Sequence, residues 1–149
     1  MSTAENRTQS ELAAILQRQI YESNIKHYIE PFAGDHIVAD NIVCEHRLVV
    51  APNGKAADEL QATMPDVLIG CGGYVDLRLP PTSQALIYCD ITGDPTQGDT
   101  FWLWCRQRAA ENHKVFILAA AAPTDFAPIW HGRGKYKKLH LYGGTLWQK

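Results

Sequence analysis

Apolar and polar positions along the chain follow helical and strand periods in turn. Residues Leu12, Ile15, Leu16 and Ile20 recur at helical spacing after Ser10, which can cap a helix. Further helices are predicted at 54–63 and 99–112, with a short helix and turn at 122–130. Strands are predicted at 27–32, 46–52, 67–77, 85–90, 115–121 and 137–144.

The inner predicted strands are continuous apolar runs, and helical stretches separate most of the strands. This pattern is typical of a parallel sheet that is covered on both faces. We therefore predict an α/β fold, a three-layer sandwich with a mostly parallel sheet. One domain is expected over residues 1–149, with a polar and flexible segment at 1–10.

Composition narrows the classes of protein. The chain has 149 residues and a formal net charge of −2, which argues against a protein that mainly coats nucleic acid. The four cysteines are widely spaced and the histidines are scattered, so we expect reduced, structural thiols and no metal site. A polar start and the lack of a long apolar run predict a cytoplasmic protein without a membrane span.

Short signatures occur in a recognisable order. They are YIEPFAGD (28–35), LVVAPNGKAADELQA (48–62), CGGYVDLRLPPTSQALIYCD (71–90), TFWLWCRQRA (100–109), KVFILAAAAPTDFAPIW (114–130) and KLHLYGG (138–144). Together they resemble DNA adenine methyltransferases, particularly the small phage-encoded type. The resemblance implies a Rossmann-like methyltransferase fold in which Glu30, Phe32 and Gly34 receive S-adenosylmethionine.

The catalytic strand of that family ends in Asp-Pro-Pro-Tyr, whereas this chain has Asp90, Ile91, Thr92 and Gly93. In the family the Asp and a prolyl carbonyl accept from the adenine amino group, and the aromatic ring stacks on the flipped base. Only the Asp remains here. Its simpler role would be to cap the next turn.

The cofactor and target elements also depart from the family. Ala51 stands where the family has an acid that holds ribose hydroxyls. Asp35 replaces a usual Gly and is expected to crowd the methionine end of the pocket, and the N-terminal Gly-Gly-Lys or Gly-Asn-Lys segment is absent. Residues 64–66 run almost directly into the strand at 67, so the target-recognition insertion is missing as well.

These departures together predict a pseudoenzyme that binds no cofactor, with Glu30, Phe32, Gly34 and Ala51 as remnants of a site. Glu30 is then expected to bond local backbone N–H groups. The predicted function of this chain is to bind another protein. The chain itself is predicted to be encoded by a phage or another mobile element. A more specific prediction is that the chain inhibits a host defence complex, either CRISPR or restriction. This step depends on the fact that phages usually encode the family, and not on any residue of the chain.

Candidate partner-binding residues are two tryptophans and a basic cluster. One of Trp102 and Trp104 is expected in the core and the other as an exposed anchor. The cluster is predicted to be a Gly-rich loop that contacts acidic protein or phosphate, unless it is a solvated hairpin tip. It comprises Arg133, Lys135, Lys137 and Lys138.

Two alternatives remain open from the sequence. The first is an enzyme that still binds S-adenosylmethionine or a related nucleotide through residues 30–34 and Asp90. The second is a nucleic-acid-binding accessory subunit that uses residues 131–138.

Overall fold

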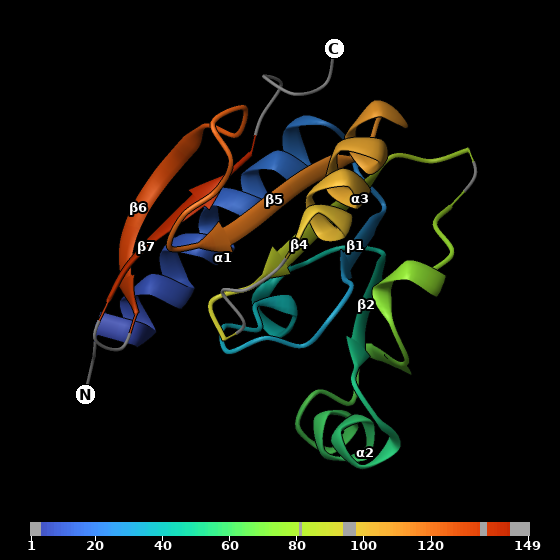
Figure 1. Cartoon of the computed structure of the whole chain (residues 1–149). Helices are drawn as coiled ribbons and strands as arrows, with labels where there is room; N and C mark the ends of the chain where they lie inside the picture. The colour runs from blue at the N-terminus through green and yellow to red at the C-terminus, as the bar shows by residue number, and fades with distance from the viewer. Residues whose placement is uncertain (1–3, 81, 94–97, 135–136, 144–149) are drawn as a thin grey trace.

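The computed structural model describes residues 4–80, 82–93, 98–134 and 137–143 (Figure 1). No helix within these ranges is both long enough and apolar enough to cross a membrane. The elements in chain order are α1 (Ala4–Glu22), β1 (His27–Glu30), η1 (Ala39–Asn41), β2 (His46–Ala51), α2 (Gly54–Thr63), β3 (Leu68–Cys71), η2 (Tyr74–Asp76), β4 (Ala85–Asp90), α3 (Asp99–Ala110), β5 (Lys114–Ala119), β6 (Pro128–Gly134) and β7 (Lys137–Tyr142). The two η elements are single turns of 3-10 helix.

The strands of the described residues form one seven-stranded sheet in the order β3-β2-β1-β4-β5-β7-β6. Strands β1 to β5 run parallel to one another, and β7 runs antiparallel to both β5 and β6. This mostly parallel sheet confirms the predicted α/β fold class. The first five strands follow the order of a Rossmann fold.

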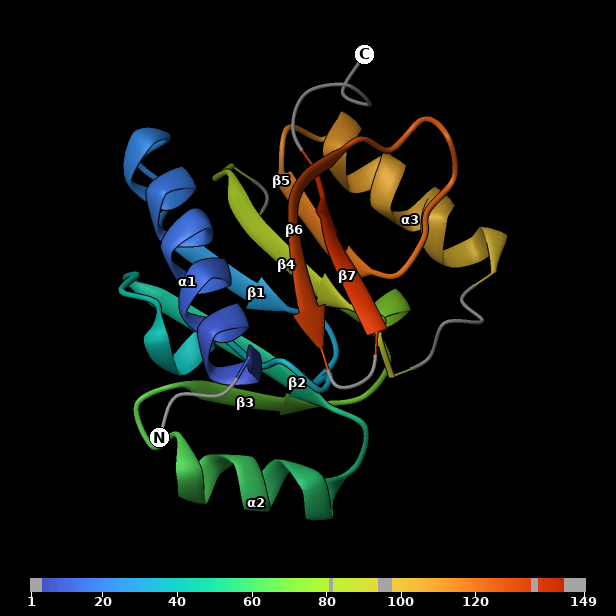
Figure 2. The same cartoon turned by 90° about the vertical axis from the view of Figure 1, so that its left-hand side faces the viewer.

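Helices cover the two faces of the sheet (Figure 2). Alternate residues of β4 and β5 point to opposite faces, as the two-residue period of a strand requires. Leu86, Tyr88, Phe116 and Leu118 pack in one buried cluster with α1. Ala85, Ile87, Cys89, Val115 and Ile117 pack in a second cluster with α3. Burial on both faces explains why these strands are apolar at every position.

Helix α1 begins at Ala4, earlier than the sequence pattern predicts. The expected cap, Ser10, lies inside the helix, and residues 4–10 form its first turns. Tertiary contacts account for the difference: Thr8 is buried, and the Gln9 side chain donates to the carbonyl of Ile37 at 3.2 Å. A polar segment can remain helical when a few of its residues pack against the body of the protein.

The segment between β3 and β4 contains no α-helix in its described residues. After Cys71 the chain makes the η2 turn, and residues 77–80 and 82–84 contain no helix or strand. The strand predicted over 67–77 is therefore short. Leu68 on β3 is 68% exposed, because no helix of the described residues covers this part of the sheet on the side of α3.

Residues 128–134 form a strand, whereas the sequence pattern predicts a short helix and turn as far as residue 130 and a Gly-rich loop from residue 131. Strand β6 pairs with β7, so His131 faces His140 and Arg133 faces Lys138 in the register. The basic cluster therefore lies largely in the two strands of an antiparallel pair, and the predicted loop does not extend over residues 131–134. Trp130 packs against the buried cluster beneath α1, which fixes β6 to the rest of the fold.

Both tryptophans of α3 are buried, so the predicted exposed anchor is wrong. Trp102 packs on Phe126 and Trp104 on Tyr74, with ring centroids 4.9 and 5.3 Å apart. The two rings face different directions, as expected, but other parts of the chain cover each of them. Leu103, which lies between them, is the large apolar residue that α3 exposes.

We expect Gly132→Ala to reduce the free energy of unfolding. A Cβ at this position would overlap the Trp130 ring, so the ring or the strand must move. Overpacking of this kind costs about 1–3 kcal/mol. Urea denaturation measures the change.

Gly54→Ala is the matched control. No atom lies within 4 Å of a Cβ added at Gly54, the first residue of α2. The control should be neutral or slightly stabilising, since Ala favours helix. Equal stability of Gly132→Ala and wild type would contradict the packing of Trp130 across Gly132.

Candidate functional site

The direction of the chain through the sheet reverses between β1 and β4. From β1 the chain proceeds outward through β2 and β3, then returns to β4 on the other side of β1 and proceeds through β5. In open α/β sheets, ligands bind at such a switch point, outside the carboxyl ends of the strands. Glu30 ends β1 and Asp90 ends β4, so both carboxylates stand at this position.

Asp90 holds the segment that follows β1. Its Oδ2 accepts from the backbone N–H of His36 at 2.6 Å and lies 3.1 Å from the Nδ1 of the same residue. Its Oδ1 accepts from the backbone N–H and the hydroxyl of Thr92, at 2.9 and 2.6 Å. Since its side chain is only 1% exposed, Asp90 acts as a positioning residue.

Glu30 holds the same segment two residues further on. Its Oε2 accepts from the backbone N–H groups of Val38 and Ala39, at 3.0 and 2.8 Å, and from the Tyr28 hydroxyl at 2.9 Å. The Tyr88 hydroxyl donates to the carbonyl of His36 at 3.0 Å. Two carboxylates and two tyrosines therefore determine the path of residues 36–39.

Burial acts on both carboxylates, with opposite net results. Burial raises the pKa of Glu30 from 4.5 to about 7, although hydrogen bonds from Val38, Tyr28 and Ala39 lower it. Burial would also raise the pKa of Asp90, but hydrogen bonds from His36 and Thr92 outweigh it and bring the pKa below its ordinary value. Of the two, Asp90 is thus the carboxyl whose surroundings favour the ionised form.

A pocket of about 420 Å³ lies at the switch point and is here called the switch-point pocket. Its volume falls within the range of small-molecule sites. Gly34 packs so closely on Asp90 that an added Cβ would lie 2.7 Å from the Asp90 Cβ, so only glycine fits there. The pocket is lined by Phe32, Ala33, Gly34, Asp35, Pro52, Gly72, Gly73, Tyr74, Asp90, Ile91 and Gly93.

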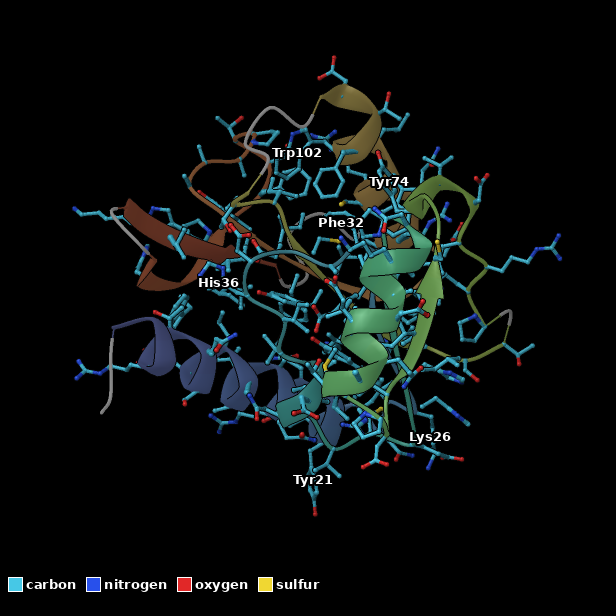
Figure 3. The ribbon with its side chains drawn as sticks, turned by 90° about the horizontal axis from the view of Figure 1, so that it is seen from below. Tyr21, Lys26, Phe32, His36, Tyr74 and Trp102 are labelled. Carbon is cyan, nitrogen blue, oxygen red and sulfur yellow. The ribbon has the colours of Figure 1, made fainter. Side chains whose placement is uncertain are left out.

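Two aromatic rings form one wall of this pocket. Phe32 and Tyr74 lie side by side in Figure 3, with centroids 5.8 Å apart, and His36 lies away from them. Phe101 contacts both rings edge-on at 5.8 Å and anchors the wall to α3. The two rings meet at 65°, so the wall is apolar but not planar, and each ring presents its own surface to a ligand.

The described lining carries negative charge and no basic side chain. Asp35 is exposed, and its Oδ2 would lie 3.1 Å from a Cβ added at Gly93, which places the carboxylate on the pocket wall. The sequence predicts that the Asp35 side chain crowds the pocket. In the structure Asp35 is one of the residues that line it. Helix α2 begins nearby, but the Asn53 side chain accepts from the backbone N–H of Ala56 at 2.9 Å and closes that end.

The predicted site residues are thus divided by the structure. Phe32, Gly34, Asp90, Ile91 and Gly93 line the pocket, whereas Glu30, Ala51 and Thr92 are buried outside its lining. His36, Tyr74 and Asp35 were given no binding role by the sequence. The one available signal for Asp35 and His36 was their position directly after the strand-turn. Tyr74 had no such signal.

The basic cluster lies away from this pocket, on β6 and β7. Lys138 is exposed. Lys135 lies outside the described residues, and for Arg133 and Lys137 the structure describes only the strand positions. Their role as partner-binding residues stays a prediction.

A larger hollow, about 770 Å³, lies at the opposite end of the sheet. It is lined by the first residues of β1, β2 and β3 and by the segment that leads into β4, including His27, His46, Leu68 and Arg78. This is the amino end of the parallel strands, where ligands of open α/β sheets do not usually bind. We therefore assign the site to the switch-point pocket despite its smaller volume.

No protein-family model and no curated protein matches the sequence. Solved structures do match the fold. A proposed methylase of Haemophilus influenzae aligns with a TM-score of 0.58 and 12% identity, over 95% of this chain and 98% of that one. The proposed methyltransferase yhhF of Escherichia coli gives 0.52 and 10%, over 90% and 84%. A conserved hypothetical protein of Streptococcus pyogenes gives 0.56 and 14%, over 89% and 94%.

These matches support the predicted methyltransferase-like fold. They also contradict the prediction that the chain is not an enzyme, because two of the three structures carry names of proposed methyl-transferring enzymes. That prediction rested on missing motif residues, and it is withdrawn. At 10–14% identity the likeness shows the fold alone.

Glu30→Gln should remove one component of the pH dependence of stability. The folded-state pKa of Glu30 lies above its ordinary value, so its contribution is complete below pH 4.5 and lost as the pH rises through about 7. The shift corresponds to about 3 kcal/mol. The difference in unfolding free energy between wild type and variant should fall by about that amount across this window.

Urea denaturation at several pH values measures this difference. Glu59→Gln, on the exposed surface of α2, is the control and should follow wild type throughout. A difference between wild type and Glu30→Gln that stays constant from pH 4.5 to above pH 7 would show that Glu30 titrates as an ordinary carboxyl.

Proposed function

We propose that the chain is an enzyme that binds S-adenosylmethionine in the switch-point pocket and transfers its methyl group. The observation that carries the proposal is the pocket itself: an aromatic wall, a glycine-lined approach and an exposed carboxylate at the switch point. The names of the structural neighbours give independent support, as proposed methylases of the same fold.

The charge of the pocket separates this ligand from other nucleotides. A cleft lined by one sign of charge concentrates ligands of the opposite sign. Phosphate-bearing nucleotides would meet Asp35 and Asp90 with no basic side chain in the described lining. S-adenosylmethionine carries a positive sulfonium and a positive ammonium group against one carboxylate, so its net charge is positive and suits an acidic wall.

The residues of this chain would each contribute differently to binding. Phe32 or Tyr74 would stack on the heteroaromatic ring, since the two rings meet at 65° and only one can lie face to face with it. Gly34, Gly72 and Gly73 would let the ligand approach the backbone. Asp35 would face a cationic group. Asp90 would keep the wall in place, since both of its oxygens already accept hydrogen bonds within the protein.

The bound cofactor supplies an electrophilic methyl group, which a nucleophile on a second substrate attacks. Orientation of the two reactants is the main contribution that a rigid pocket makes to such a reaction. The adenine-binding arrangement of the resembling family is not proposed for this chain. Ile91 and Thr92 are buried at the positions of its prolines, and the carboxylate of Asp90 is engaged.

Binding is tested first. We expect calorimetry to give a micromolar Kd for S-adenosylmethionine, and Asp35→Asn to weaken it about two- to fivefold, as for an exposed charge pair. The same substitution should weaken the binding of S-adenosylhomocysteine less, because this ligand lacks the sulfonium charge. Asp76→Asn, an exposed aspartate of η2 outside the pocket lining, should leave both affinities unchanged.

No binding of S-adenosylmethionine to wild type at concentrations up to about 1 mM would end the proposal, since the free energy would then be weaker than about −4 kcal/mol. Binding that Asp35→Asn leaves unchanged would retain the pocket and remove only the role of Asp35.

Methyl transfer is tested with labelled S-adenosylmethionine and the separated RNA, DNA and protein of a bacterial lysate. We expect label in one fraction with wild type and none with Gly73→Trp, because a large side chain at this pocket-lining position should exclude the cofactor. The fold should tolerate the change, since Gly73 has φ −94° and no atom within 4 Å of an added Cβ. Equal incorporation by the variant would place the reaction elsewhere.

A further inference from the structure

Two histidines face one another on the strands β6 and β7, outside the lining of the switch-point pocket. His131 and His140 are direct partners in the antiparallel register, and Figure 2 shows the two strands side by side. Their Nδ1 atoms are 2.6 Å apart, and their rings are nearly perpendicular, at 89° with centroids 4.7 Å apart. At this distance there is room for one proton between the two nitrogens, so at least one of them presents a lone pair.

Two imidazole nitrogens this close together can share one transition metal, because imidazole is a ligand that suits Zn, Cu, Fe and Ni. With metal–nitrogen bonds of about 2.0–2.1 Å, two ligands at 90° are about 2.9 Å apart, and two tetrahedral ligands about 3.3 Å. The observed 2.6 Å needs a smaller adjustment for the 90° arrangement. Tetragonal sites with nitrogen ligands favour Cu(II) and Ni(II) over Zn(II).

The surroundings allow the rest of a coordination shell. A hollow of about 330 Å³ adjoins the pair and is lined by His131, Gly132, Lys138 and His140. Gly132 contributes no side chain, which leaves room for water ligands. Across the residues that the structure describes, no third His, Cys, Asp or Glu joins the pair, so water would have to complete the shell.

Lys138 lines the same hollow as the two histidines. The same Lys138 repels a cation. Its removal should therefore strengthen metal binding without touching either ligand.

We propose that His131 and His140 form a two-histidine site for a divalent transition metal of the Ni(II) and Cu(II) class, which links β6 to β7. The sequence does not indicate it, because the two residues are nine positions apart and match no metal motif. Only the register of the hairpin brings them together.

A second pair of histidines in the same chain serves as an internal control for the proposed metal site. His27 and His46 are also register partners, on β1 and β2. Their rings are stacked, with an interplanar angle of 20° and centroids 4.8 Å apart, so they present faces to each other and not nitrogens. Such a pair should not chelate a metal in the same way.

The test is calorimetric titration of the full chain, without an affinity tag and with its thiols kept reduced, with Ni²⁺ near neutral pH. We expect one equivalent to bind. His131→Ala and His140→Ala should each weaken binding about tenfold or more. His46→Ala should bind as wild type does, and Lys138→Gln should bind more tightly.

Thermal denaturation gives a second readout, since a ligand that binds only the folded state raises Tm. Ni²⁺ should raise the Tm of wild type and of Lys138→Gln, but not of His140→Ala. Absence of Ni²⁺ binding by wild type would overturn the proposal. So would equal losses for His46→Ala and His140→Ala, or binding that is unaffected in Lys138→Gln.

Discussion

Two buried carboxylates at the ends of adjacent strands hold the segment on which the whole site depends. Glu30 accepts from the N–H groups of Val38 and Ala39, and Asp90 accepts from that of His36. Buried backbone N–H groups need partners, and a chain that turns away from a strand end has lost those of the sheet. By supplying them, the two acids bring Gly34 against Asp90, and the same segment carries Phe32 and Asp35 to the pocket.

This constraint changes the meaning of the residues after Asp90. From the sequence, the missing prolines and aromatic residue predict loss of the site. In the structure the end of β4 has a different role, because Asp90 bonds Thr92 and His36, and the aromatic wall comes from Phe32 and Tyr74 in other segments. Missing motif residues indicate that one known substrate geometry is absent. They do not show that the pocket is gone.

The sheet could be predicted because its apolar runs are long and continuous, as at 85–90 and 115–119, and burial on both faces leaves such a pattern. Contacts between distant residues could not be predicted. The burial of both Trp102 and Trp104 depends on Phe126 and Tyr74, and the strand at 128–134 depends on pairing with β7. The pairing of His36 with Asp90 could not be predicted either, because the two residues are 54 positions apart.

The most direct measurement is a crystal structure of the chain with sinefungin, a stable and positively charged analogue of S-adenosylmethionine. We expect the analogue in the switch-point pocket, with its purine on Phe32 or Tyr74, an ammonium group near Asp35, and residues 36–39 still bonded to Glu30 and Asp90. An analogue bound in the hollow at the amino ends of β1 to β3, or no bound analogue at saturating concentration, would contradict the assignment of the site.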